Sequence, residues 1–455
     1  MEHMGLGKEY LENALGYSVD KFELTAGSNL GDGYTCALLR VDVWKVYDEP
    51  GDPISIIVKC YPLNESRQEF LESWNIFKVE LGMYERVIPA LTKFLEILPE
   101  SERMPLPFAP MIFGQYIKPE DRLSLGRPLK PSDNSIVMPD LRKMPKGPFI
   151  LRDRFLGFDL DHCMLVIENQ ARLHAIAWAY KSKRGHDSLH EEFPFLDNKF
   201  GELLKAFSSY TEANIRTNEA LFHDRPEILG ALEHLKSIYA SVEELYYECG
   251  VNHKEKGHTK DNILKVPGEI VQDEVPWRTL LHGDCWSNNM MFRYDEETGR
   301  PVQVIFIDLQ ISRESDPMID ISYALFTSAQ LDVRRKHLKS MLHVYFDTFT
   351  EICDKFSVEP FPGWSWKEFN RRFHRAQVIG GYMALDLHIM LKCTDEMENL
   401  DDTMAKLDTK GEDETDNTQK VVNFFTQIAN TKKVHPAFLP RFSAVFEELI
   451  EDGIL

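Results

Sequence analysis

Two short segments near the N-terminus have the spacing of apolar residues that is typical of β-strands. Residues 36–44 and 54–59 are apolar or alternate between apolar and polar side chains, and the segment Glu49–Pro53 between them has the composition of a turn. This pattern predicts an antiparallel hairpin. The glycine-bearing segment Gly27–Gly33 comes immediately before it, so a loop is expected at the opening of the sheet.

From Phe70 onward the apolar positions change to a helical period. Residues 70, 74, 77, 81, 84 and 88 recur every three or four positions, which predicts an amphipathic helix that ends near Pro89. Glu80 lies three residues after Phe77 and four before Tyr84. Its side chain is therefore expected on the buried face of this helix.

A proline-rich stretch follows, and the later pattern is mainly helical. The pattern predicts strands at Met111–Ile117 and Ser135–Met138, amphipathic helices at 161–180, 198–222 and 226–249, and a polar loop at 250–262. The change of pattern near residues 138–141 predicts an α+β, bilobal chain. We expect an N-terminal lobe at residues 1–138 with a small antiparallel sheet, a hinge at 139–141, and a large, mainly helical C-terminal lobe at 142–455.

A departure from the helical pattern begins at Thr279–Leu281, a short apolar entry to a polar loop at residues 282–289. Two predicted strands, Met290–Tyr294 and Val302–Ile307, follow on either side of a turn. The second strand ends at Asp308. A polar loop, a hairpin and a carboxylate thus follow one another along the chain.

The loop contains His282, Asp284 and Asn289, at the spacing found in the catalytic loop of protein kinases. Phosphoryl transfer needs one carboxylate that accepts the alcohol proton, and a second carboxylate with a neutral oxygen ligand that hold Mg²⁺. Aspartate and asparagine at this spacing alone are common in ordinary loops. The preceding histidine and the strand that ends at Asp308 favour the catalytic interpretation.

Lys59 ends the second strand of the predicted hairpin. Burial of an unpaired ammonium group is costly, and Glu80 on the inward face of the next helix is the expected partner. Such a pair orients the lysine toward nucleotide phosphates in kinases. The loop Gly31-Asp32-Gly33 is a weak signal alone, because glycine pairs are common in turns. Its position before the hairpin suggests backbone N–H groups that cover phosphates.

Two further polar residues lie on predicted helices. His174 is interpreted as a core histidine with satisfied hydrogen bonds rather than a ligand. Asp320 precedes a predicted helix, where it is expected either to cap that helix or to hold the His282 loop by hydrogen bonds.

Charge narrows the range of partners. The 455 residues include 73 Asp and Glu against 52 Lys and Arg, for a formal net charge of −21. This charge repels nucleic acid and anionic membrane surfaces, so neither is expected as a partner. Residues 394–416 hold ten acidic residues and two lysines, and this run is interpreted as a solvated, mobile surface segment.

The seven cysteines are scattered along the chain, and no two of them have the Cys-x-x-Cys spacing. This distribution predicts reduced thiols, no structural zinc and a cytoplasmic location. The N-terminal residues lack the apolar core of a signal peptide, and no stretch of about 18 apolar residues predicts a membrane span.

Together these segments resemble the choline/aminoglycoside-kinase-like fold and, within it, the ecdysteroid-kinase-like group common in insects. The residues that carry the resemblance are Leu281–Phe292, Ile305–Gln310, Asp320–Leu325, Val58-Lys59, Glu80–Tyr84 and Phe446–Leu455. They extend over nearly the full chain. The resemblance implies a bilobal protein-kinase-like fold that transfers the γ-phosphate of ATP, with Mg²⁺, to a hydroxyl of an ecdysteroid or another lipophilic alcohol.

The resemblance also implies roles for individual residues. Asp284 would be the catalytic base, and Asn289 and Asp308 would be catalytic residues that bind Mg²⁺. Lys59 with Glu80 would orient the phosphates. The nucleotide-binding set is completed by the phosphate loop and the hinge, through residues Gly31, Asp32, Gly33, Tyr34, Pro139 and Leu141. His282 and Asp320 would support the loop.

Two residues depart from the pattern of that group. Pro139 stands where a glutamate is usual, and proline keeps its carbonyl but lacks an N–H. The Pro139 carbonyl and the Leu141 N–H are still expected to read the base, while the preference between ATP and GTP stays open. Cys36 replaces a serine that is common in the phosphate loop, which removes one hydroxyl donor.

Two alternatives remain at the level of sequence. One is a choline- or aminoglycoside-type kinase of a cationic alcohol. The other is a non-catalytic kinase fold that binds a hormone or other ligand, supported by Cys36 and Pro139. Protein-kinase activity is disfavoured because no Asp-Phe-Gly motif and no activation segment follow the predicted loop.

Overall fold

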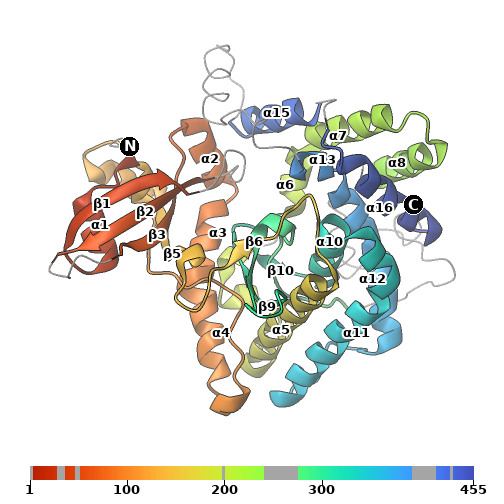
Figure 1. Cartoon of the computed structure of the whole chain (residues 1–455), viewed down its shortest axis with the longest axis horizontal. Helices are drawn as coiled ribbons and strands as arrows, with labels where there is room; N and C mark the ends of the chain where they lie inside the picture. Colours follow the sequence, from red (N-terminus) through yellow and green to blue (C-terminus); the bar gives the residue numbers. More distant parts are fainter. Residues whose placement is uncertain are drawn as a thin grey trace.

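The computed structural model of the chain describes residues 4–27, 36–46, 52–196, 200–239, 275–391, 417–430 and 434–455. Within these ranges the chain forms an α+β fold, with one antiparallel sheet in the N-terminal part and a mainly helical C-terminal part (Figure 1). The predicted phosphate loop at residues 31–34, the polar loop at 250–262 and the acidic run at 394–416 lie outside the described residues.

The N-terminal sheet has five strands in the order β1-β2-β3-β5-β4. Their bounds are β1 Val19–Ala26, β2 Ala37–Lys45, β3 Ile54–Cys60, β4 Phe113–Gln115 and β5 Ser135–Pro139. The predicted hairpin is confirmed, since β2 pairs antiparallel with β3 from Ala37 opposite Cys60 to Val43 opposite Ile54. Strand β5 runs one residue beyond the expected lobe boundary at residue 138.

Side chains of β3 alternate between two environments, as the pleat of a strand requires. Ile56 and Val58 pack with Leu11 of helix α1 (Lys8–Leu15) in one apolar cluster. Ile57 and Lys59 point to the opposite side, where they line a cavity. The hydrophobic face of the sheet is thus covered by α1, and Lys59 is left facing the cavity.

The predicted helix after Phe70 forms as several pieces: α2 Glu65–Ser73, α3 Ile76–Gly82, a π-helical turn at Met83–Val87, and α4 Ile88–Leu95. The expected end near Pro89 is wrong. Pro89 lies in the first turn of α4, where its missing N–H is tolerated. The N–H of Ile88 reaches back to the carbonyl of Met83, which closes the wider turn.

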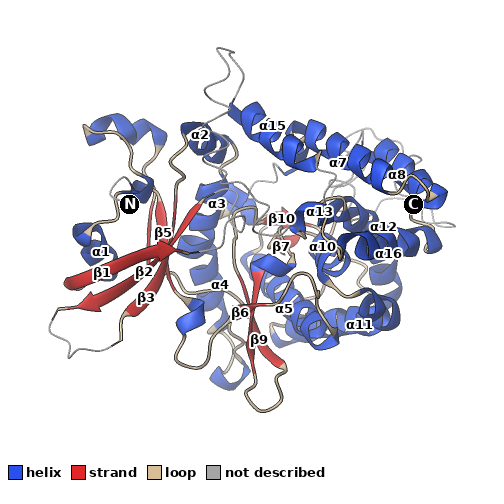
Figure 2. Ribbon diagram, turned by 45° about the horizontal axis from the view of Figure 1, so that its top comes forward, coloured by secondary structure: helices blue, strands red, loops and turns tan. Residues whose placement is uncertain are grey.

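The C-terminal part is built around two long helices, α5 and α11, which pack together, and around α10 packed on α12 (Figure 2). The helix predicted at 161–180 is confirmed within α5. The bounds are α5 Leu160–Arg184, α6 Phe200–Ala206, α7 Ser208–Leu221, α8 Pro226–Tyr239, α10 Met318–Ser328, α11 Leu331–Lys355, α12 Trp366–Ala384, α13 Leu387–Met390, α15 Asn417–Ala429 and α16 Phe438–Glu451.

Two small sheets lie between the large sheet and these helices. One has the order β6-β8-β9, with β6 Ile150–Leu151, β8 Met290–Tyr294 and β9 Pro301–Phe306, and the other pairs β7 Thr279–Leu281 with β10 Arg313–Ser315. The hairpin predicted after the polar loop is confirmed by the antiparallel pairing of β8 and β9. The two sheets hold residues 282–289 between them.

Helix α15 contacts both α2 and α7, so it joins the N-terminal and C-terminal parts along one edge of the molecule (Figure 1). Aromatic rings line this contact. The Phe207 ring centroid lies 6.1 Å from that of Phe70 in α2 and 5.7 Å from that of Phe425 in α15. The two parts are therefore connected at a second place besides the chain segment after β5.

In the described part of the chain, the cysteines at positions 36, 60, 163, 285 and 353 are free thiols, and all five are buried. No helix within the described ranges is both long enough and apolar enough to cross a lipid bilayer.

Candidate active site

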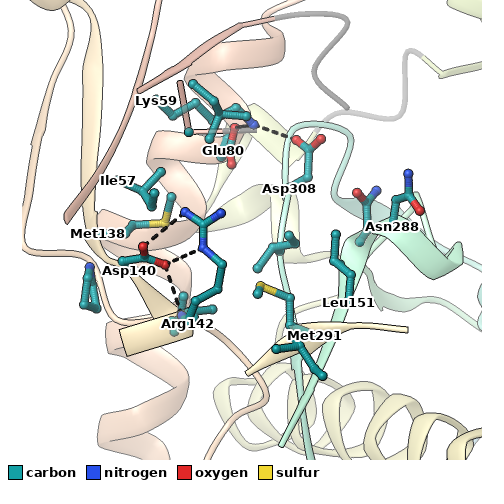
Figure 3. Close-up of a pocket in the computed structure, with 18 of the residues that line it drawn as sticks. Ile57, Lys59, Glu80, Met138, Asp140, Arg142, Leu151, Asn288, Met291 and Asp308 are labelled. Carbon is teal, nitrogen blue, oxygen red and sulfur yellow. Dashed lines mark hydrogen bonds and ion pairs between the residues drawn. The ribbon is translucent and has the colours of Figure 1, made fainter. Parts of the chain in front are cut away.

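Lys59 of β3 lies between two carboxylates. Its Nζ is 2.5 Å from Glu80 Oε2 and donates a hydrogen bond of 2.6 Å to Asp308 Oδ1 (Figure 3). Lys59 and Glu80 are buried, whereas the Asp308 side chain is 28% exposed. The structure therefore brings together a strand, a helix and the segment that follows β9, which are far apart in the sequence.

The charges in this group stabilise one another. Burial disfavours the ammonium form of Lys59, but the neighbouring carboxylates of Asp308 and Glu80 outweigh this effect and raise its pKa well above the ordinary value. Burial raises the pKa of Glu80, against the opposing effect of the Lys59 charge. Such a buried set depends on all of its members, because removal of the cation leaves a carboxylate without compensation.

The loop after β7 is held by a carboxylate from α10. Asp320 accepts hydrogen bonds from the backbone N–H of His282 at 2.8 Å and of Gly283 at 3.0 Å. The capping interpretation of Asp320 is wrong, because it lies within the first turn of α10, whose N-cap position is Pro317. Its hydrogen bonds to the His282 loop match the second interpretation.

Two local features fix the shape of this turn. Gly283 has a φ of 89°, and a Cβ there would lie 2.4 Å from the Ile311 carbonyl oxygen, so only glycine fits. His282 Nδ1 accepts from the Asp284 N–H at 3.1 Å, and its Nε2 therefore donates to the Ile307 carbonyl at 2.9 Å. The histidine thus ties the start of the loop to the end of β9.

His174 on α5 is buried and hydrogen-bonded on both ring nitrogens. Its Nδ1 lies 2.7 Å from the Tyr345 hydroxyl, and its Nε2 lies 3.3 Å from Asp320 Oδ2. The interpretation as a satisfied core histidine is confirmed. It lies behind the loop and supports Asp320 from the helical side.

Asp284 is half-buried, and both of its carboxylate oxygens accept a hydrogen bond. Tyr323 Oη donates to Oδ1 and Asn289 Nδ2 donates to Oδ2, each at 2.8 Å. Burial, with the nearby charge of Asp308, raises the pKa of Asp284 above that of an ordinary aspartate. A carboxylate held in a fixed orientation with a raised pKa is suited to accept a proton.

Asn289 and Asp308 are the candidate metal ligands, and both line one cavity. Asn289 uses its Nδ2 for the backbone and side chain of Asp284. Its carbonyl Oδ1 is then the atom left for a ligand. Asp308 has a φ of 65°, a left-handed backbone that is uncommon outside glycine.

This donor set fits Mg²⁺ only together with a substrate. Within the described residues no group of three or more His, Cys, Asp or Glu side chains is arranged to hold a metal ion. One carboxylate and one amide oxygen are nevertheless what Mg²⁺ commonly takes from a protein when phosphate oxygens and water complete its shell. The residues present therefore fit a metal that arrives with a polyphosphate.

The cavity has a volume of about 490 Å³ and lies between the sheet and the loop. Lys59, Glu80 and Asp308 gather at one end (Figure 3). The middle is apolar, with walls formed by Leu38, Ile57, Ala109, Met138, Leu151, Met291 and Ile307. Its shape and polarity suit a ligand with a flat apolar part and a charged tail.

The predicted hinge lines the other part of this cavity through Pro139 and Leu141. The Asp140 N–H donates to the Ser55 carbonyl of β3 at 3.0 Å. The backbone polar groups of successive residues alternate in direction along an antiparallel strand. The Pro139 carbonyl therefore points away from β3. The Leu141 carbonyl accepts from the Phe149 N–H.

Cys36 is buried beside the Lys59 group. Burial raises the pKa of its thiol to about 12, and Lys59, Glu80 and Asp308 all act on its charge. The thiol is neutral at physiological pH, so it adds no charge at this end of the cavity.

Two residues that shape this region were not predicted from the sequence. One is Tyr323, which contacts Asp284; its position three residues after Asp320 on one helix face was the available signal. The other is the buried Asp140, whose carboxylate accepts from Arg142 Nε at 2.8 Å and Nη2 at 3.1 Å (Figure 3). The adjacent pattern gave no sign that Arg142 would line the cavity.

A model of the ecdysteroid kinase-like family matches residues 30–358, which is most of the chain. The protein belongs to this family. The match includes Lys59, Glu80, the 282–289 loop and Asp308, so the ecdysteroid kinase-like residues include the whole charged end of the cavity. Family membership supports a small-molecule kinase, and hence a phosphotransferase.

No curated protein matches the chain. Similar solved structures include the GDP complex of aminoglycoside 2'-phosphotransferase-IIIa, with 10% identity and a TM-score of 0.35, covering 92% of this chain and 97% of that chain. An aminoglycoside-3'-phosphotransferase of type VIII has 14% identity and a TM-score of 0.33, with 84% and 100% covered. A choline/ethanolamine kinase family protein from Mesorhizobium loti has 11% identity and a TM-score of 0.31, with 92% of each chain covered.

Proposed function

We propose that the protein is an ATP- and Mg²⁺-dependent kinase that phosphorylates a hydroxyl of an ecdysteroid or another lipophilic alcohol. The observation that carries this proposal is the contact of Lys59 with both Glu80 and Asp308 at one end of the cavity. In a kinase, a lysine held in this way faces the phosphates of the nucleotide. Residues 1–138 and 142–455 would be the two lobes and 139–141 the hinge.

The nucleotide would lie along the cavity. Its base would pack between Ile57 and Met291 in the apolar middle, with its edge toward the Pro139 carbonyl and the Leu141 N–H. Its phosphates would extend toward Lys59. The phosphate loop at Gly31–Tyr34 belongs to this proposal as well.

Asp284 would accept the proton of the reacting hydroxyl. The acceptor oxygen then forms a bond to the γ-phosphorus while the bond from that phosphorus to the β-phosphate oxygen breaks, so ADP leaves and the proton remains on the carboxyl of Asp284. The hydrogen bonds from Tyr323 and Asn289 would keep the carboxylate in position for this transfer. Asn289 Oδ1 and Asp308 would hold Mg²⁺, which supplies positive charge to the transferred phosphate when bound.

The test is incubation of the full chain with Mg-ATP and 20-hydroxyecdysone, followed by a panel of sterols and other lipophilic alcohols. Mass spectrometry should detect a product heavier than its substrate by one phosphate group. Its formation should require Mg²⁺ and be lost in the variant Asp284→Asn. The proposal fails if no alcohol is phosphorylated and the protein does not bind nucleotide in the presence of Mg²⁺.

The same assay separates the two alternatives. Phosphorylation of choline or an amino sugar, without phosphorylation of any neutral alcohol, would favour a kinase of cationic alcohols. Ligand binding without turnover in the wild type, retained in Asp284→Asn, would favour a non-catalytic binding protein.

A further inference from the structure

Helix α7 carries an unusual row of buried polar side chains. Thr211, Asn214, Thr217 and Asn218 are all at most 7% exposed. Residues 211, 214 and 218 recur at three- and four-residue spacing and so share one face of the helix. Polar groups are rarely buried without partners, so each oxygen and nitrogen of this row calls for an explanation.

Part of the explanation is a carboxyl group at the end of α12. Asp386 Oδ1 accepts hydrogen bonds from Tyr210 Oη at 2.8 Å and from Asn214 Nδ2 at 2.7 Å. Both of these donors are neutral. Among the described residues, no lysine, arginine or histidine forms an ion pair with Asp386. Neither of these two hydrogen bonds reaches the second carboxyl oxygen of Asp386, Oδ2.

Two amide oxygens in the same row have no partner. Asn214 Oδ1 and Asn218 Oδ1 are buried, and neither accepts a hydrogen bond from any described residue. Asn214 is 1% exposed, and Asn218 is fully buried. An orphaned carbonyl oxygen of this kind indicates a site where a donor binds, because desolvation without a hydrogen bond is unfavourable.

This polar group lies close to the proposed catalytic base. Helix α12, which ends two residues before Asp386, packs on α10, and α10 carries Tyr323, whose hydroxyl contacts Asp284. The charges of the two aspartates interact: burial, together with Asp284, raises the pKa of Asp386 to about 7. Asp386 therefore belongs to the surroundings of Asp284 on the side that the cavity lined by Lys59 does not include.

We propose that Asp386 and Asn214 bind a second hydroxyl of the acceptor, one that is not itself phosphorylated. This inference rests on the proposed function and deepens it: the acceptor would be a polyol whose two hydroxyls are held by separate carboxyls. One hydroxyl would meet Asp284 and the other would donate to Asp386 or to the amide oxygen of Asn214.

The amide oxygens without a partner determine which chemical group of a ligand can bind there. The amide oxygens of Asn214 and Asn218 accept hydrogen bonds but donate none, so the group that meets them must be a donor. A hydroxyl fits better than an ammonium ion. The neutral hydroxyl of Tyr210 already donates to Asp386, and a hydroxyl of the ligand is a donor of the same kind.

The test measures binding by calorimetry on the full chain. The probes are 20-hydroxyecdysone and a series of analogues that each lack one hydroxyl, and the variants are Asp386→Leu and Asn214→Ala. Asp332→Asn, an exposed aspartate on α11, serves as the matched control. ATP binding is measured for every variant as a check that it is folded.

Asp386→Leu should weaken binding of 20-hydroxyecdysone about tenfold, the loss of one hydrogen bond to a carboxyl, with ATP binding unchanged. At least one deoxygenated analogue should bind the wild type about tenfold more weakly, yet lose no further affinity in Asp386→Leu, because the two changes remove the same contact. If Asp386→Leu does not fold, Asn214→Ala should show the same dependence on that hydroxyl.

Several results would overturn the inference. The first is that both variants bind 20-hydroxyecdysone within twofold of the wild type. The second is that, for every analogue, the loss of affinity from the missing hydroxyl adds to the loss from Asp386→Leu. The third is a preference for choline that Asp386→Leu abolishes. The proposed function fails separately: if the wild type binds 20-hydroxyecdysone with the expected pattern but transfers no phosphate, only the inference stands. If the wild type phosphorylates the polyol and Asp386→Leu binds it equally well, only the function stands. Absence of polyol binding by the wild type overturns both.

Discussion

The two sides of Asp284 use polar groups in different ways. On the cavity side, charged groups meet charges of opposite sign: Lys59 contacts Glu80 and Asp308, and Arg142 contacts Asp140. On the side of α7, the carboxyl of Asp386 meets only the neutral donors Tyr210 and Asn214 within the described residues. One side is organised around fixed ions, and the other around hydrogen bonds.

This difference follows the chemistry proposed for each side. A polyphosphate carries several negative charges whatever the acceptor is, so the groups that face it must be ionised and fixed in place. A neutral alcohol gains little from an ion and is distinguished by the number and position of its hydroxyls. Variants on the cavity side should therefore affect turnover and folding strongly, whereas variants on the α7 side should change selectivity.

The largest effect is expected for Asp284, which both sides share. Asp284→Asn should lower kcat by about 10²–10⁴-fold because it removes the proton acceptor, while KM for ATP changes little. The measurement is initial-rate kinetics of phosphorylation with the best acceptor found. A variant that keeps a tenth of wild-type kcat would exclude Asp284 as the base.

The next effect concerns folding on the cavity side. Lys59→Met should lower the free energy of unfolding by about 3–5 kcal/mol, because Glu80 is then buried without a counter-charge. Urea unfolding followed by circular dichroism measures this. The double variant Lys59→Met/Glu80→Leu should recover most of the loss.

Lys336→Met is the matched control, since that lysine is exposed on α11. It should change the free energy of unfolding by less than about 0.5 kcal/mol. Equal losses in the single and double variants would show that the ion pair does not decide the stability of this region.

A smaller effect is expected for Tyr323, which supports Asp284 from the helical side. Its hydrogen bond lowers the pKa of Asp284, while burial and Asp308 raise it. The base works in its deprotonated form, so Tyr323→Phe should raise that pKa further and move the acid limb of the kcat/KM profile to higher pH. On the acid limb of the profile the rate should fall about fivefold, the equivalent of one hydrogen bond.

The pH profile distinguishes positioning from simple loss of structure. A variant that is slower by the same factor at every pH, with an unmoved acid limb, would mean that Tyr323 does not act through the titration of Asp284.

The smallest effect is a pH-dependent change in stability at Asp386, which faces the titratable groups Tyr210 and Asp284. Its pKa is about 7 in the folded protein, above that of an unfolded aspartate. The contribution to stability is therefore complete at low pH and is lost as pH rises through 7. Between pH 6 and pH 8 the wild type should lose about 1 kcal/mol that Asp386→Asn does not lose.

Thermal unfolding of both proteins across this range tests the sign, with Asp332→Asn as the control. A wild type that becomes more stable than Asp386→Asn as pH rises would contradict the assignment.

Much of the fold follows from the sequence, because local periodicity decides it. The hairpin before Lys59 and the strand pair after residue 289 form with the expected partners. The pattern after Phe70 did not reveal the break at Asn75, which adopts a φ of 53°, or the continuation through Pro89. Both depend on how the helices pack, and an apolar stripe reads the same whether its helix is continuous or broken.

The residues of the candidate site also fall into two groups, those that the sequence predicts and those that it does not. Asp284, Asn289 and His282 lie within one loop, so their spacing is visible along the chain. Tyr323 and Asp140 contact residues that are distant or that have no recognisable spacing, and Asp386 meets α7 only through tertiary packing. A motif appears in a sequence only when one short segment contains most of it.

Helix α15 has a mechanical consequence for a fold of this kind. It contacts α2 beside the sheet and α7 in the helical part, where Thr217 Oγ1 also donates to the Ala429 carbonyl at 2.7 Å. A rigid-body rotation about the segment after β5 must therefore either break the contact between α15 and α2 or move α7 with it. Helix α7 carries the two side chains that hold Asp386. A change in the angle between the two parts is therefore coupled to a change in the geometry of the polar row. The molecule thus has fewer independent motions than two bodies joined at one hinge.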